Sequence, residues 1–200
     1  MSINVCNDRS MASITSLPSG VSGSSLVLLS EQTASSSSTI SFTSGIDSTY
    51  KEYIFKFFDI HAGTDNVNFT VGFRDGSTDY DATKTTTYFY GYNTEASGGG
   101  TLEYEASGDL AQGTGFQYLS SQIGTGNDEC LVGTLHLFDP SSTTFVKHFI
   151  STTNIYDRAD ISVNLYVAGY CNVTAAIDGV QFKMSSGNID AGTIKMYGVV

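Results

Sequence analysis

Apolar and polar positions alternate along much of this 200-residue chain, and the alternation predicts β-strands. In residues 67–74, Val67, Phe69, Val71 and Phe73 occupy every second position, with polar or small residues between them. Residues 161–167 repeat this pattern. A period of two places successive side chains on opposite faces of a strand. Each segment therefore predicts a strand with one buried face.

Another segment carries apolar side chains on both of its faces. Tyr53, Phe55 and Phe57 share one face, while Ile54 and Phe58 share the other. A strand of this composition is typical of a sheet that is covered on both sides. We therefore expect both of these faces to be buried.

Further strand-like segments follow one another along the chain, and no segment has the sequence pattern of a helix of ten residues. Long polar, glycine-rich loops are expected over residues 74–83, 95–100 and 106–126. Many short strands joined by turns and long loops indicate an all-β protein, a two-sheet antiparallel sandwich of the jelly-roll type. In chain order the expected strands cover residues 26–33, 39–43, 50–61, 67–74, 84–93, 131–138, 144–151, 161–167, 177–184 and 193–199.

The start of the chain differs from the rest, since 16 of the 27 serines fall within the first 50 residues. We divide the chain into an extended N-terminal arm over residues 1–25 and a β-sandwich domain over residues 26–200. The arm is either a disordered tail or a segment that orders on a neighbouring subunit. In the second case its irregularly spaced apolar side chains contact the partner, namely Ile3, Val5, Ile14, Leu17 and Val21.

The net charge and the hydropathy of the chain exclude some classes of binding partner. Nine Lys and Arg against 20 Asp and Glu give a net charge of −11, and the cations are scattered singly. Nucleic-acid binders carry a basic stripe, and an anionic membrane repels an acidic surface, so we expect neither partner. A hydrophobic content of 40% argues against disorder. Residues 1–9 lack the pattern of a secretory leader, so we expect a protein made inside the cell.

Candidate catalytic and metal-binding groups are sparse. Glu103 and Glu105 face the same way on a short strand-like segment, but the chain has no Trp for stacking a sugar in a glycosidase cleft. The loop Asp75–Asp81 lacks the ligand spacing of an EF-hand. His136 and His148 could approach each other across a hairpin, yet a third metal ligand is missing. No catalytic motif occurs, so we expect neither an enzyme nor a cofactor or metal site.

One strand carries a row of tyrosines. Tyr88, Tyr90 and Tyr92 fall on one face of the segment 84–93, with Phe89 on the other. The row is either sheet packing or a contact for a glycan or a protein, because tyrosine combines an apolar ring with a polar hydroxyl. Both interpretations stay open.

Three segments have distinctive sequences: residues 133–150 (GTLHLFDPSSTTFVKHFI), 185–198 (SSGNIDAGTIKMYG) and 39–58 (TISFTSGIDSTYKEYIFKFF). These segments are similar to structural proteins of tailed bacteriophages, especially marine ones. The resemblance spans roughly residues 26–199 and implies a jelly-roll or lectin-like virion component. It carries over no catalytic residue.

Together these observations favour a capsid decoration or cement protein located in the virion. Its expected partners are the major capsid protein or other virion proteins, and its expected assembly is a homotrimer. The alternative is a tail fibre or receptor-binding module, in which the long loops and the tyrosine strand bind host surface glycan.

Overall fold

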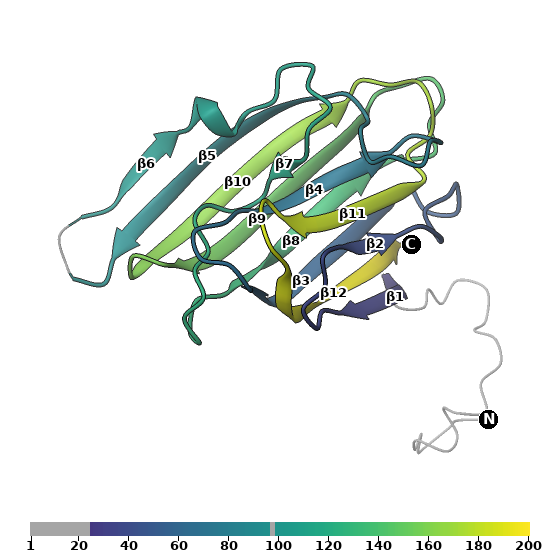
Figure 1. The fold of residues 1–200 in the computed structure, drawn as a ribbon. Helices are drawn as coiled ribbons and strands as arrows, with labels where there is room; N and C mark the ends of the chain where they lie inside the picture. The colour runs from purple at the N-terminus through teal and green to yellow at the C-terminus, as the bar shows by residue number, and fades with distance from the viewer. Residues whose placement is uncertain (1–24, 97–98) are drawn as a thin grey trace, which may run out of the picture.

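The computed structural model describes residues 25–96 and 99–200, which form an all-β structure (Figure 1). All five expected arm contacts, from Ile3 to Val21, lie outside the described residues. A single short 3-10 helix, Ala106–Gly108, accompanies the strands in the described residues. The strands are β1 (Leu26–Thr33), β2 (Ile40–Phe42), β3 (Glu52–Ala62), β4 (Phe69–Arg74), β5 (Lys84–Thr94), β6 (Thr101–Tyr104), β7 (Gln117–Tyr118), β8 (Leu131–Phe138), β9 (Lys147–Asp157), β10 (Ile161–Cys171), β11 (Gly179–Met184) and β12 (Ile189–Val199).

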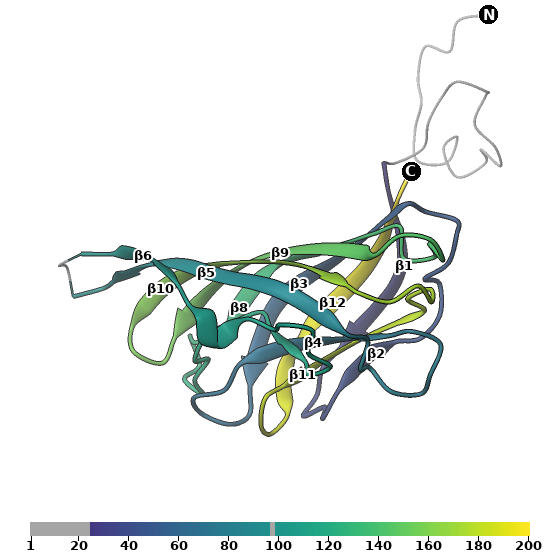
Figure 2. The same cartoon turned by 90° about the horizontal axis from the view of Figure 1, so that it is seen from above.

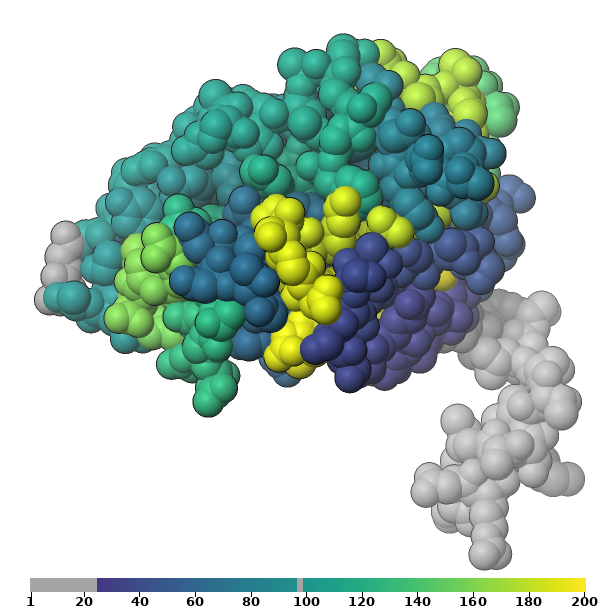
Figure 3. Space-filling view, viewed as in Figure 1, coloured from purple at the N-terminus to yellow at the C-terminus, as the bar shows by residue number. Residues whose placement is uncertain are grey.

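Two antiparallel sheets pack as a sandwich, which confirms the predicted fold class. The large sheet has the order β1-β12-β3-β8-β9-β10-β5-β6, and the small sheet has the order β2-β11-β4-β7. Eight strands pair in nested order: β1 with β12, β2 with β11, β3 with β8, and β4 with β7. Successive pairs alternate between the two sheets, which is the arrangement of a jelly roll. In Figure 3 the N-terminal strands, in dark blue, accordingly lie beside the C-terminal residues, in yellow.

Four strands are additions to this nested set. The hairpin of β5 and β6 is inserted between β4 and β7, and the hairpin of β9 and β10 is inserted between β8 and β11. Both hairpins join the large sheet beyond β8. The small sheet has no matching extension, so the end of the large sheet at β6 projects past it (Figures 1 and 2).

A cluster of phenylalanines lies in the core between the two sheets. Phe57, Phe69 and Phe182 are buried, and their ring centroids lie 5.2–5.6 Å apart. Phe42 and Phe55 pack edge-to-face at 5.3 Å beside them. Each fully buried phenylalanine contributes about 1.5–3 kcal/mol relative to an exposed one. This aromatic cluster holds the small sheet against the part of the large sheet that contains β3.

Most of the predicted strands are confirmed, and two boundaries differ in an informative way. β1 and β8 begin and end where the pattern predicts. β9 continues six residues beyond the predicted end at Ser151, because inward-facing Thr153 and Asp157 interrupt the apolar alternation. The predicted loop 106–126 contains the short strand β7, which is held to β4 by two residue pairs.

The expectation that β3 is buried on both faces is wrong at one end. Tyr53, Phe55 and Phe57 are buried against the small sheet, and Ile54 is covered on the other face. Phe58, however, is 41% exposed, because no layer of the described residues covers the outer face of the large sheet there. Its ring lies beside the Lys195 ammonium at 5.7 Å. Phe58 is therefore a surface residue on a half-buried strand.

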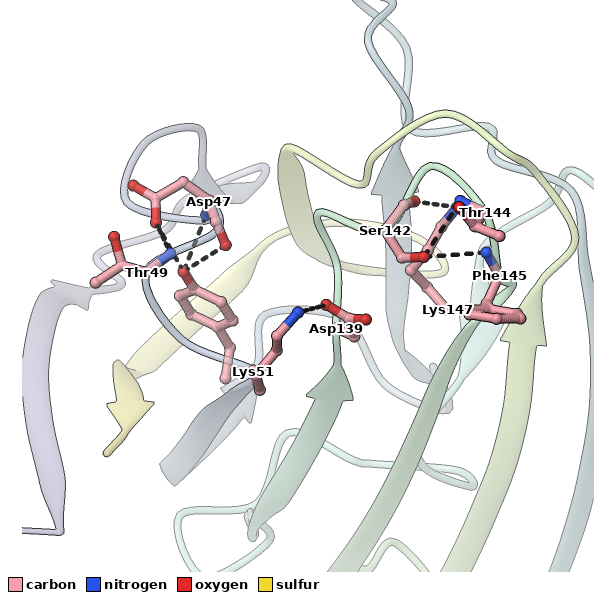
Figure 4. Close-up of polar contacts among 9 residues, drawn as sticks. Asp47, Thr49, Lys51, Asp139, Ser142, Thr144, Phe145 and Lys147 are labelled. Carbon is pink, nitrogen blue, oxygen red and sulfur yellow. Dashed lines mark hydrogen bonds and ion pairs between the residues drawn. The ribbon is translucent and has the colours of Figure 1, made fainter.

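Hydrogen bonds tie the loops at one end of the sandwich, as Figure 4 shows. The Tyr53 hydroxyl accepts from the Asp47 amide and donates to the Asp47 carbonyl, at 2.9 and 3.0 Å. Lys51 pairs with Asp139 at 2.8 Å. The Ser142 hydroxyl accepts from the Phe145 amide at 3.0 Å. The contacts of Asp139 and Ser142 order the predicted turn between β8 and β9, while those of Tyr53 order the loop between β2 and β3.

Candidate functional site

The added strands present two different faces, and each is a candidate functional surface. The inner face, which is continuous with the core, is hollowed where the small sheet ends. We name this hollow the tyrosine groove. Its lining comes from β5, β6 and β10 and from the loops that flank β7 and connect β9 to β10. Its lining residues include Asn68, Tyr88, Tyr90, Tyr92, Glu103, Glu105, Tyr118, Ser121, Gln122, Asp157, Ile161 and Val163.

The predicted row of tyrosines forms one wall of the groove. Tyr88, Tyr90 and Tyr92 share the inner face of β5, as predicted, and their neighbouring ring centroids lie 6.2 and 6.1 Å apart. Tyr88 is buried and its hydroxyl donates to the Ser120 carbonyl at 3.2 Å, so it belongs to the core. Tyr90 and Tyr92 are half-buried and line the hollow. They alone of the row offer an accessible surface.

Carboxylates lie beside these rings. Glu103 is directly opposite Tyr90 on β6, and the Tyr90 hydroxyl donates to its carboxylate at 3.0 Å. Burial, together with this hydrogen bond, raises the pKa of Tyr90 to about 12. The phenol therefore stays protonated and keeps donating at neutral pH. Glu105 accepts from the Ser107 amide and hydroxyl, which lowers the pKa of its carboxyl.

The groove consists of two adjoining hollows of about 250 and 190 Å³. Both are lined by Tyr90, Ser121 and Gln122, so these three residues connect them. The Ser121 hydroxyl oxygen is buried and has no hydrogen-bond partner among the described residues. A buried hydroxyl without a partner costs about 1–3 kcal/mol. Ser121 is thus a polar group at the junction of the two hollows whose bonding capacity is unused.

The outer face of the added strands and of the adjacent β8 carries no formally charged side chain. We name it the charge-free face; it comprises the even-numbered residues of β8, β9, β10 and β6 and the odd-numbered residues of β5. All of these residues are described, and none is Asp, Glu, Lys or Arg. Charges appear on the outer face only from β3 onward, with Glu52 and Lys56, followed by Lys195 and Glu31. In a chain of net charge −11, the outer face of five adjacent strands therefore carries no Asp, Glu, Lys or Arg.

Aromatic side chains cross the charge-free face in one row. Tyr166 lies opposite Phe89, and Phe89 lies opposite Tyr104. The rings of Phe89 and Tyr166 are stacked, with centroids 5.1 Å apart. Ile150 is 50% exposed near the middle of the face. A shallow hollow of about 380 Å³ lies beside it, over Ala168, where the small side chain leaves space between longer neighbours.

The two histidines of the predicted hairpin do not face each other. Ile150 is the residue opposite His136, so His148 lies one position further along the same face. His136 contacts Glu52 at 2.6 Å, while the ring of His148 lies against Tyr170 at 5.9 Å. Within residues 25–96 and 99–200, no group of three His, Cys, Asp or Glu is placed to hold a metal ion. No helix in the same ranges is long and apolar enough to cross a bilayer.

Buried polar residues gather at the other end of the inner face. Lys84, Cys171 and Lys147 lie side by side across β5, β10 and β9, and all three are buried. Lys147 donates to three backbone carbonyls, and Lys84 donates to one. Burial lowers the pKa of both amines and raises the pKa of the Cys171 thiol to about 12. The two lysines therefore hold the neighbouring loops by hydrogen bonds to backbone carbonyls, and Cys171 is packed as expected for a buried free cysteine.

Compared with known proteins, the chain matches no family model, no curated protein and no solved structure. The functional argument therefore rests on the two faces. The sequence pattern identified the tyrosine wall of the groove and singled out Glu103. It missed Ser121 and Gln122, which the loop after β7 brings to the groove, and Asp157, the last residue of β9. It also missed the charge-free face, because its five strands are distant from one another in the chain. The signal in the sequence that could have indicated this face is the lack of charged residues at every second position of each strand.

Proposed function

We propose that this chain is a structural protein of a bacteriophage particle, a decoration or cement protein that stabilises the capsid shell. The observation that carries the proposal is the charge-free face. In this proposal the face contacts other copies of the chain in a homotrimer and the major capsid protein. Protein interfaces are depleted in charged residues at their centre and enriched in tyrosine and phenylalanine, as this face is.

The net charge of the chain explains why such a face suits assembly. Copies that each carry a charge of −11 repel one another. A contact made through Asp or Glu would add the cost of removing like charges from water. The charge-free face brings Tyr166, Phe89 and Ile150 to a contact without that cost. Repetition of one contact by symmetry then gives the shell a strength that a single contact lacks.

The jelly-roll topology supports the same class of function by analogy. Jelly rolls form capsid proteins and lectins, so the topology fits both a shell component and a receptor-binding module. The second candidate, a tail fibre or receptor-binding module, is favoured by the tyrosine groove. The position of the protein on the particle separates the two candidates.

The test uses particles produced by the phage genome that encodes this chain. Electron microscopy of intact particles with a bound antibody fragment should place the protein on the capsid surface. Particles that lack the gene should lose infectivity faster on heating and on osmotic shock than complete ones. Label on the tail would favour the second candidate, and unchanged resistance of gene-deleted particles would contradict the cement role.

A further inference from the structure

We propose that the tyrosine groove binds an uncharged oligosaccharide, with the rings of Tyr90 and Tyr92 as its stacking surface. This inference does not depend on the cement role, because the groove and the charge-free face lie on opposite faces of the same strands. It applies to the protein whether it lies on the capsid or on the tail.

The shape of the groove suits an extended, narrow ligand. Its two hollows adjoin along β5 and share Tyr90, Ser121 and Gln122. Tyr90 and Tyr92 present their rings with 36° between their planes, so together they make one nearly continuous apolar wall. An apolar wall with polar groups at its edge matches a sugar ring, which has C–H groups on its faces and hydroxyls around its rim.

The polar groups supply both donors and acceptors. Ser121, Gln122 and Asn68 each carry a side chain that can donate and accept hydrogen bonds. The Gln122 side-chain oxygen accepts from Arg158 at 3.3 Å, which leaves the amide NH₂ for a ligand. The Ser121 hydroxyl has no hydrogen-bond partner among the described residues, although Ser121 lines both hollows. A sugar hydroxyl, itself a donor and an acceptor, would satisfy it.

The charges of the groove select against acidic ligands. Glu103, Glu105 and Asp157 line it, and no lysine or arginine is among its lining residues. An oligosaccharide that carries carboxylate, sulfate or phosphate groups would face like charges, whereas an uncharged one donates its hydroxyls to the carboxylates. A lysine or arginine side chain can only donate, whereas each sugar hydroxyl can both donate to the carboxylates and accept from Ser121, Gln122 or Asn68, so we favour the uncharged saccharide.

The test is a glycan array probed with the full chain, followed by calorimetric titration of the strongest ligand. We expect uncharged oligosaccharides to bind and acidic ones to be rejected. Tyr92→Ala should weaken binding about tenfold or more, and Tyr90→Phe, which keeps the ring, should weaken it less. Tyr80→Ala, in the loop between β4 and β5, is the matched control and should bind like the unchanged chain.

Several outcomes would overturn the proposal. They are the absence of binding by a folded chain, a preference for acidic glycans, preferential capture of a lysine-rich peptide, or equal affinity of the Tyr92→Ala and unchanged proteins. Circular dichroism of each variant confirms that the fold is intact. None of these outcomes bears on the cement role, which is tested on the particle.

Discussion

The two faces of the added strands are built from alternating residues of the same strands, yet they differ in shape and charge. On β10, Leu165 points into the sandwich, while its neighbour Tyr166 points out to the charge-free face. On β5, Tyr90 faces the acidic groove, while Phe89 stacks with Tyr166 outside. A shift of the strand register by one residue would move each of these side chains to the opposite face of the sheet. The comparison teaches that one extension of the large sheet supplies both a hollow on its inner face and an outer face without charged side chains.

We expect the largest effect from a substitution that tests which face contributes more to the free energy of unfolding. Leu165→Ala removes a fully buried side chain from the inner face, so the free energy of unfolding should fall by about 2–5 kcal/mol. Tyr166→Ala, one residue further along, should lower it by about 1 kcal/mol or less. Chemical denaturation at a protein concentration that keeps the chain monomeric measures both. Equal losses would show that the outer face is as tightly packed as the inner one.

The next effect concerns association through the charge-free face. Ile150→Lys places an unpaired charge near its centre, so association between copies should weaken about a hundredfold. Leu28→Lys is the matched control, because Leu28 is also 50% exposed on the outer face but lies on β1, at the opposite edge of the large sheet. Sedimentation equilibrium compares the two variants with the unchanged chain. If Leu28→Lys weakened association as strongly, the contact would not be confined to the charge-free face.

The sequence pattern predicted the fold better than the two faces, for a physical reason. Alternation within Phe69–Arg74 or Leu131–Phe138 depends on neighbours along the chain, so local residues suffice to predict those strands. Which strands lie side by side is decided by long-range pairing, and β8, β10 and β5 become near neighbours only through the two inserted hairpins. The pattern at Phe58 misled because an apolar residue at a surface position looks the same in sequence as one in the core. Ser121 carried no signal, because its place in the groove depends on the path of the loop that follows β7.

The smallest effect is a pH dependence that belongs to the groove. The pKa of Tyr90 is raised to about 12 from 10.0, so above pH 10 the unfolded chain loses this proton before the folded chain does. The stabilisation is complete below pH 10 and is lost as the pH rises through 12. Tyr90→Phe removes this contribution, so its stability should fall less steeply over that range. Denaturation curves at several pH values measure the difference. Parallel pH profiles of the two proteins would contradict the buried, hydrogen-bonded phenol.

The most direct test of the central claim, that the charge-free face joins copies of the chain, is sedimentation equilibrium of the unchanged protein at increasing salt concentration. Salt screens the repulsion between chains of charge −11 and leaves an uncharged contact intact. The proposal therefore predicts a self-associating chain whose association strengthens as salt is raised. A chain that stays monomeric at every concentration, or an assembly that dissociates as salt is raised, would contradict it.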